Sequence, residues 1–173
     1  MADRQRFQIV TKRSRIVAEV RSTLQELKVE ASIFDGWFEV SLAGRRLEPS
    51  PSPMGGVTVE VRGLRSGNRL FDLDLQRTLE MKKYPLMVGE LRQVTAGDAD
   101  GSYRVRGELR MHGEQQAVEG DAKVTFAEDG SIGISAEMVL NFEDFGVKAR
   151  RLLMLKVLPE VRIRGEVVAV AVR

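Results

Sequence analysis

The chain has 173 residues, and its 27 basic and 25 acidic side chains nearly balance at a formal net charge of +2. It contains no cysteine and one histidine, which excludes disulfides and thiolate metal sites and argues against zinc chemistry or a nucleophilic triad. No apolar run of about 18 residues occurs, and the charged start of the chain lacks the apolar segment of a secretory signal, so we expect a cytoplasmic protein without an integral membrane segment, folded as a single domain over residues 1–173.

Alternation of apolar and polar residues recurs along the chain and predicts β-strands, because successive side chains of a strand point to opposite faces. It is clearest over 103–111, where apolar residues alternate with arginines and a glutamate. In chain order, the segments expected as strands are 7–21 (broken near 12–15), 37–42, 57–62, 86–94, 103–111, 115–126, 131–142 and 161–172.

Turn and helix signals separate these strands. The proline-rich segment 48–56 predicts a loop, and the glycine-containing segments 66–68, 97–101 and 128–130 predict turns. From Asp72 or Asp74 to Lys82 the apolar period shifts toward 3.6, which predicts a short helix ended by Pro85. The connection 143–159 is expected to be irregular or partly helical.

The number of strands favours a closed architecture. About eight antiparallel strands with one solvent-exposed face close readily into a barrel, and closure removes exposed sheet edges. The interior of such a barrel is wide enough for side chains or one small ligand. The predicted fold class is therefore all-β, a single antiparallel eight-stranded barrel with a short helix.

Two interpretations of the inner face remain open: its side chains fill the barrel, or they line a ligand cavity. The apolar inward-facing residues that we take as candidate ligand-binding residues are Phe38, Val40, Val59, Val61, Tyr103, Val105, Leu109, Met111, Phe126, Met138 and Leu140.

Polar residues give little support for other functions. Strand arginines at 104, 106, 110, 162 and 164 form either a basic stripe or an ordinary solvated face, and the chain has few aromatics for base stacking, so we expect no nucleic-acid partner. His112 follows a strand and is expected to be a turn or hydrogen-bonding residue rather than a general base.

Four stretches together resemble the YceI-like family: FQIVTKRSRI at 7–16, VEVRGLRSGNRLFDLDL at 59–75, YRVRGELRMHGEQQAV at 103–118, and LNFEDFGV at 140–147 followed by PEVRIRGEVVA at 159–169. The chain departs from many members at Val10 and Arg13, where these carry aspartate and histidine.

The resemblance implies an extended lipocalin-like barrel around a long apolar cavity that holds a polyisoprenoid chain. It implies non-enzymatic lipid binding, storage or transport, with no cofactor beyond the lipid. It is also compatible with a homodimer. The alternative is a structural or protein-interaction barrel with a filled core. From charge and loop position, we expect a lipid head group to meet cations at the barrel mouth, among them Arg13, Arg65, Lys148, Arg150 and Arg151.

Overall fold

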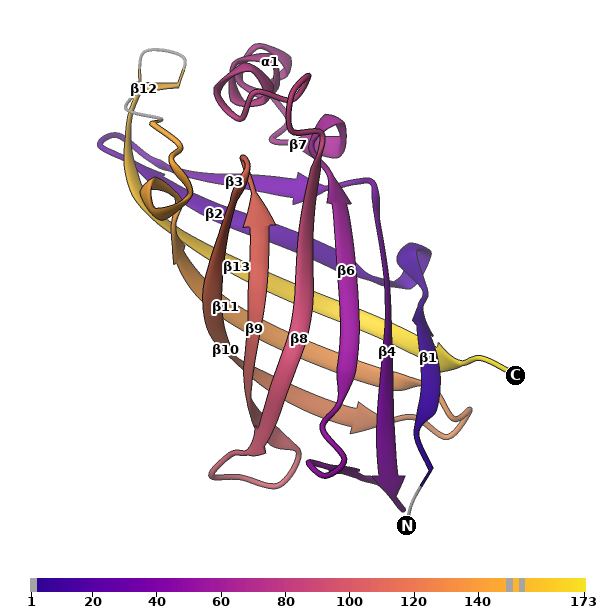
Figure 1. The fold of residues 1–173 in the computed structure, drawn as a ribbon. Coiled ribbons are helices and arrows are strands. Elements are labelled where there is room, and N and C mark those ends of the chain that lie inside the picture. Colours follow the sequence, from indigo (N-terminus) through magenta and orange to yellow (C-terminus); the bar gives the residue numbers. More distant parts are fainter. Residues whose placement is uncertain (1–2, 149–150, 153–154) are drawn as a thin grey trace.

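The computed structural model describes residues 3–148, 151–152 and 155–173, and its main feature is a closed antiparallel barrel (Figure 1). The closed path runs through eight strands, with β1 pairing both β4 and β13, which confirms the predicted fold class. In the order of their pairing these strands are β1 (Gln5–Ile9), β4 (Phe34–Ala43), β6 (Met54–Glu60), β8 (Leu86–Ala96), β9 (Ser102–Met111), β10 (Glu114–Phe126), β11 (Ile132–Asn141) and β13 (Leu155–Ala171).

Shorter elements extend this barrel. Strands β2 (Arg15–Ser22), β3 (Glu26–Ala31) and β7 (Leu64–Arg65) continue the sheet from the first part of β13, while β5 (Arg46–Glu48) pairs with β4 and β12 (Arg151–Leu152) with β13. The remaining elements are the helix α1 (Arg69–Thr78) and three 3-10 turns, η1 (Thr11–Arg13), η2 (Val61–Gly63) and η3 (Phe142–Phe145).

The predicted break in the first strand is present at η1. It divides the strand into β1, which pairs with the end of β13, and β2, which pairs with an earlier part of β13. Ser14 holds the break in place, because its hydroxyl donates to Val10 O at 2.8 Å and accepts from Val168 N at 3.0 Å. One long strand, β13, thus supports both halves.

The predicted start and end of the helix were wrong. The helix starts at Arg69 because the side chain of Asn68 accepts a hydrogen bond from Phe71 N at 3.1 Å and caps the first turn. Asp72, expected near the helix start, is buried inside the first turn and accepts from Ser66 N at 2.8 Å. The helix ends before Glu80, whose φ of 51° is incompatible with continuing it.

Several strand limits also differ from the prediction. Strand β6 starts at Met54, so only 49–53 of the predicted loop lies between strands, and Val61 falls in η2 rather than in a strand. Strand β3 was not among the predicted segments. Strand β13 starts at Leu155 and passes through Pro159, which lies within a register shift between Val157 and Val161. Proline is compatible with such a bulge because the ladder is interrupted there.

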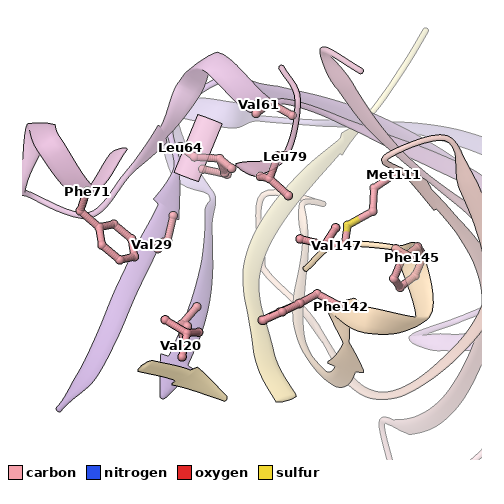
Figure 2. Packing of buried hydrophobic residues seen from close by; sticks show 12 residues of the cluster. Val20, Val29, Val61, Leu64, Phe71, Leu79, Met111, Phe142, Phe145 and Val147 are labelled. Atoms are coloured by element: carbon pink, nitrogen blue, oxygen red, sulfur yellow. The ribbon is translucent and has the colours of Figure 1, made fainter. Parts of the chain in front are cut away.

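Buried side chains gather at the two ends of the barrel. The far-end cluster consists of Phe7, Phe38, Val40, Ile132 and Ala169, with the rings of Phe7 and Phe38 stacked 5.3 Å apart. The α1-end cluster consists of Val20, Val29, Ala31, Val61, Leu64, Phe71, Leu79, Met111, Phe142, Phe145, Val147 and Val157. Figure 2 shows Phe71 of α1 pointing toward Val29 of β3, so the helix packs its apolar side onto this end of the barrel.

Within the described residues, no helix combines the length and apolar character needed to cross a membrane.

Candidate functional site

The strand register places the candidate residues on the inner face of the barrel. On β9, Tyr103 and Met111 are buried whereas the arginines between them are exposed, so the odd-numbered positions face inward. Val105 of β9 lies opposite Gly120 of β10, which in turn lies opposite Met138 of β11. Residues distant in sequence therefore share one inner wall.

Most of the candidate residues lie at the two packed ends. Phe38 and Val40 belong to the far-end cluster, and Phe126 packs against it. Val61 and Met111 belong to the α1-end cluster, with Val59 and Leu109 packed against it, and Leu140 is also buried. Tyr103 is buried, and its hydroxyl accepts a hydrogen bond from Leu47 N at 3.1 Å. Val105 and Met138 remain only partly buried between the ends.

Small residues line the inner face between the packed ends. Gly165 of β13, Ala136 of β11 and Ala122 of β10 form one cross-strand row, and Gly89 of β8 faces inward opposite Leu109. A Cβ atom added at Gly165 would meet nothing closer than 3.8 Å, and one at Gly89 nothing closer than 4.0 Å. Each position thus has room for a Cβ atom in ordinary van der Waals contact.

These small residues were missed from the sequence, because we selected large apolar side chains as ligand contacts. The available signal was the glycine at inward positions of otherwise good strands, since an interior strand glycine marks a bend, a bulge or a close approach. At Gly120 the neighbouring strand comes close, because an added Cβ would lie only 2.6 Å from Glu137 O. Gly89 and Gly165 differ from it because an added Cβ would meet no neighbour closer than 3.8 Å.

At the seam between β10 and β11, the ladder stops partway along the two strands. The two strands pair from Phe126–Ile132 only as far as Gly120–Met138, and a hollow of about 410 Å³ lies where they separate. Its lining includes inward-facing residues, among them Val118, Met138 and Leu140, together with the outward-facing Glu119 and Asn141. Residues of both faces of the wall thus border this hollow.

The 3-10 turn η3 covers one side of this seam. Gln116 of β10 donates a hydrogen bond from Nε2 to Asp144 O at 2.9 Å, and Phe145, 1% exposed, also lines the hollow. Gly146, with a φ of 72°, ends η3 in the left-handed region that glycine tolerates best.

His112 connects three segments at the α1 end. Its Nδ1 lies 3.0 Å from Phe145 O of η3, and its Nε2 is hydrogen-bonded to the carboxylate of Glu80, just after α1. The Tyr84 ring contacts it edge-on, with ring centroids 5.1 Å apart. The expectation of a hydrogen-bonding turn residue is confirmed.

Charges on the outer wall are largely paired. Arg104 contacts Glu119 at 2.8 Å and Asp121 at 3.0 Å, and Arg106 contacts Glu119 at 3.0 Å. The hydrogen bond from Arg104 and the charge of Arg106 lower the pKa of Glu119, and the same hydrogen bond raises the pKa of Arg104.

The other predicted stripe arginines also have partners. Arg162 contacts Glu137 at 2.7 Å, Arg164 contacts Glu19 at 3.5 Å, and Arg110 donates to the Gln115 side chain at 2.9 Å. The arginines thus form a mixed-charge wall rather than a bare basic stripe. This arrangement is typical of a solvated sheet face.

The predicted head-group cations are not all brought together. Hydrogen bonds from Ser131 lower the pKa of Asp129, and the charge of Arg13 in η1 adds to this shift. Arg65 lies in β7 near α1, well away from η1 (Figure 1). Lys148 is exposed just after η3. Arg150 and the side chain of Arg151 lie outside the described residues. In the same described part of the chain, no three histidine or acidic side chains are arranged to hold a metal ion.

The fold and its interior define the protein as a closed antiparallel β-barrel with an apolar interior, an architecture whose interior is either filled by side chains or holds a small ligand. A family model described as the YceI-like domain matches residues 7–169, and the chain belongs to this family. The resemblance found in the sequence is thus confirmed.

Solved structures of the same fold are similar in shape but distant in sequence. BcnA of Burkholderia cenocepacia has a TM-score of 0.76 at 14% identity, with 92% of this chain and 98% of that chain covered. A polyisoprenoid binding domain from Saccharophagus degradans, implicated in plant cell wall breakdown, has a TM-score of 0.75 at 15% identity, with 96% and 98% covered. The Campylobacter jejuni YCEI protein has a TM-score of 0.69 at 18% identity, with 88% and 89% covered. A search of curated proteins finds no match.

Proposed function

We propose that the protein binds a long apolar isoprenoid-like lipid in the barrel lumen and stores or carries it without catalysing a reaction. The observation that carries this proposal is the pair of inward-facing glycines, Gly89 and Gly165, which lie on the inner wall between two packed ends and where an added Cβ would have room. In a filled-core interaction barrel, the alternative, we would expect larger side chains at inward positions that have room for them.

The physical driving force is burial of the lipid chain. Each methylene removed from water contributes about 0.8 kcal/mol, so the affinity grows with the length of chain that the lumen accepts. The partly buried Val105 and Met138 are the candidate residues placed to contact the chain. The Saccharophagus degradans neighbour, described as polyisoprenoid-binding, supports a ligand of this class.

The proposal is tested by native mass spectrometry of freshly purified protein, followed by organic extraction and identification of what is released. The critical variant is Gly165→Leu, which places a side chain in the lumen where a Cβ meets no close contact. We expect this variant to fold and to lose most of its lipid, because the added side chain occupies the space of the ligand. The matched control is Lys123→Leu, which adds the same side chain at an exposed position of β10.

The two outcomes separate the alternatives. An apolar adduct that is present in the parent protein and in Lys123→Leu, but lost from folded Gly165→Leu, supports the carrier function. Bare parent protein that also refuses added polyprenols, or an unchanged lipid content in folded Gly165→Leu, contradicts it.

The same proposal includes a cytoplasmic carrier that needs no cofactor besides its lipid. The absence of cysteine is compatible with a reducing compartment, and cell fractionation tests the location. A homodimer remains a prediction, which light scattering after size-exclusion chromatography tests.

A further inference from the structure

The outward face of α1 combines exposed leucines with arginines. Leu70 is 67% exposed and Leu73 46% exposed, unusual values for large apolar side chains on a helix. At about 100° per residue these leucines share one side of the helix with Arg69 and Arg77, both of which are exposed. The opposite side carries Phe71, Leu75 and Leu79, which pack onto the barrel.

Acidic side chains near α1 do not neutralise this face. Asp72 is buried and accepts a hydrogen bond from Ser66 N, and Asp74 is half-buried. Glu80 is engaged by His112. In the described part of the chain, Arg69 and Arg77 form no ion pair.

Further cations lie next to the helix. Arg65 precedes α1, and its guanidinium donates to the carbonyl oxygens of Arg62 and Leu64. Among the residues that the structure describes, no carboxylate forms an ion pair with Arg65. Lys82 and Lys83 follow α1 and are exposed. The surface around Leu70 and Leu73 is therefore positively charged.

Other exposed apolar residues lie at the same end. Leu24, at the tip of the β2–β3 turn, is 81% exposed, and Leu158 of β13 is 42% exposed. Thr23 N of this turn donates to Lys156 O of β13 at 3.0 Å, Lys156 pairs with Arg151 of β12, and β12 contacts α1. Figure 1 shows α1, β12 and the β2–β3 turn grouped at one end of the barrel.

We propose that the α1 end of the barrel docks onto an anionic lipid bilayer, with Leu70 and Leu73 entering the boundary between head groups and acyl chains while Arg69 and Arg77 contact lipid phosphates. A helix with leucines and arginines on its exposed face is suited to lying in a membrane interface. The purpose of this docking, transfer of a lipid between bilayer and lumen, rests on the proposed function; the binding to vesicles does not require it.

Charge complementarity favours a lipid bilayer as the binding partner of this surface. Leucine side chains set between arginines match a layer in which anionic phosphates lie just above hydrocarbon. The helix also covers the α1-end cluster, so docking brings the membrane next to the end of the barrel that α1 closes.

The docking is tested by co-sedimentation with vesicles of phosphatidylcholine alone and of phosphatidylcholine mixed with phosphatidylglycerol. We expect binding to the mixed vesicles that weakens as salt is raised, because salt screens the arginine contacts. Arg69→Gln with Arg77→Gln should weaken binding about 25-fold, at roughly fivefold per charge. Leu70→Ser with Leu73→Ser should weaken it by about tenfold or more, because insertion of the leucines is lost.

Two matched control variants remove the same number of charges, or of exposed apolar side chains, as the α1 variants, but at positions away from α1. Arg45→Gln with Lys123→Gln removes two exposed charges elsewhere on the barrel, and Val170→Ser with Val172→Ser removes two exposed apolar side chains near the chain end. Neither control should change vesicle binding by more than about twofold. Circular dichroism and thermal melting establish that every variant remains folded.

Failure of the docking is distinguishable from failure of the carrier function. No binding to mixed vesicles, equal binding to both vesicle types, or equal losses in the controls and the α1 variants overturns the docking, whatever lipid the protein carries. The docking is also overturned if the α1 face binds a protein in a pull-down while the protein does not bind vesicles. Vesicle binding by a protein that extracts no lipid upholds the docking and removes only the carrier function.

Discussion

At the scale of single residues, His112 illustrates how one side chain holds several segments together. It lies in a left-handed backbone conformation, with a φ of 54°, at the turn between β9 and β10. From there its ring reaches the Phe145 carbonyl oxygen and the Glu80 carboxylate. The sequence identified it as a turn residue, but both partners are more than 30 residues away in sequence, so neither was visible from spacing.

Replacing this histidine should measurably destabilise the fold. We expect His112→Ala to lower the free energy of unfolding by about 1–3 kcal/mol, because the Phe145 carbonyl loses its partner and Glu80 is released. His112→Asn, which tolerates a positive φ, separates hydrogen-bond loss from backbone strain. Gln115→Ala, at an exposed position, should stay within about 0.5 kcal/mol. Urea unfolding curves check these values, and an unchanged midpoint for His112→Ala would contradict the connecting role.

At the scale of elements, α1 shows why helix limits were harder to predict than strands. Strand alternation repeats at every second residue, so a strand is recognisable from a few positions. The helix is only ten residues long, and two acidic residues inside it, Asp72 and Asp74, resembled its cap. The actual cap, Asn68, was placed in the preceding turn because asparagine is favoured in both positions.

The cap gives a direct test of the helix. Asn68→Ala should lower the free energy of unfolding by about 1 kcal/mol, since the backbone N–H of Phe71 loses its acceptor. Asn68→Asp should retain most of the stability, because aspartate also accepts at this position. Thermal or urea unfolding measures both variants. Equal stability of Asn68→Ala and the parent would show that the cap does not support α1.

At the scale of the whole molecule, the barrel is closed by pairing between residues far apart in the chain. The first strand, β1, meets the end of the last strand, with Phe7 opposite Ala171. Within the ring, the β8–β9 ladder has a register shift between Leu91 and Gln93, and the β10–β11 ladder ends at Gly120 and Met138. The wall beside η3 therefore lacks ladder bonds between β10 and β11, which weakens it there.

Hydrogen exchange should locate this weakness. We expect amides of 114–119 and 139–141 to exchange faster on average than those of 120–126 and 132–138. The reason is that residues 114–119 of β10 and 139–141 of β11 are not hydrogen-bonded to one another across the seam. Exchange followed by peptide mass spectrometry resolves these segments. Uniform protection across the seam would contradict the separation of β10 from β11. The β4–β6 pairing, which involves neither strand, serves as an internal reference.

The sequence by itself determined the all-β class, the order of most strands and the family, because alternation, turn residues and local motifs are all short-range properties. It also determined which residues of β9 face inward, since that follows from strand period alone. Only the tertiary structure decided that Phe38 and Met111 pack at opposite ends, while Gly89 and Gly165 lie between these ends with room for a Cβ. These properties depend on cross-strand register and on how α1 and η3 pack onto the barrel, and such long-range packing is not encoded in the spacing of any one segment.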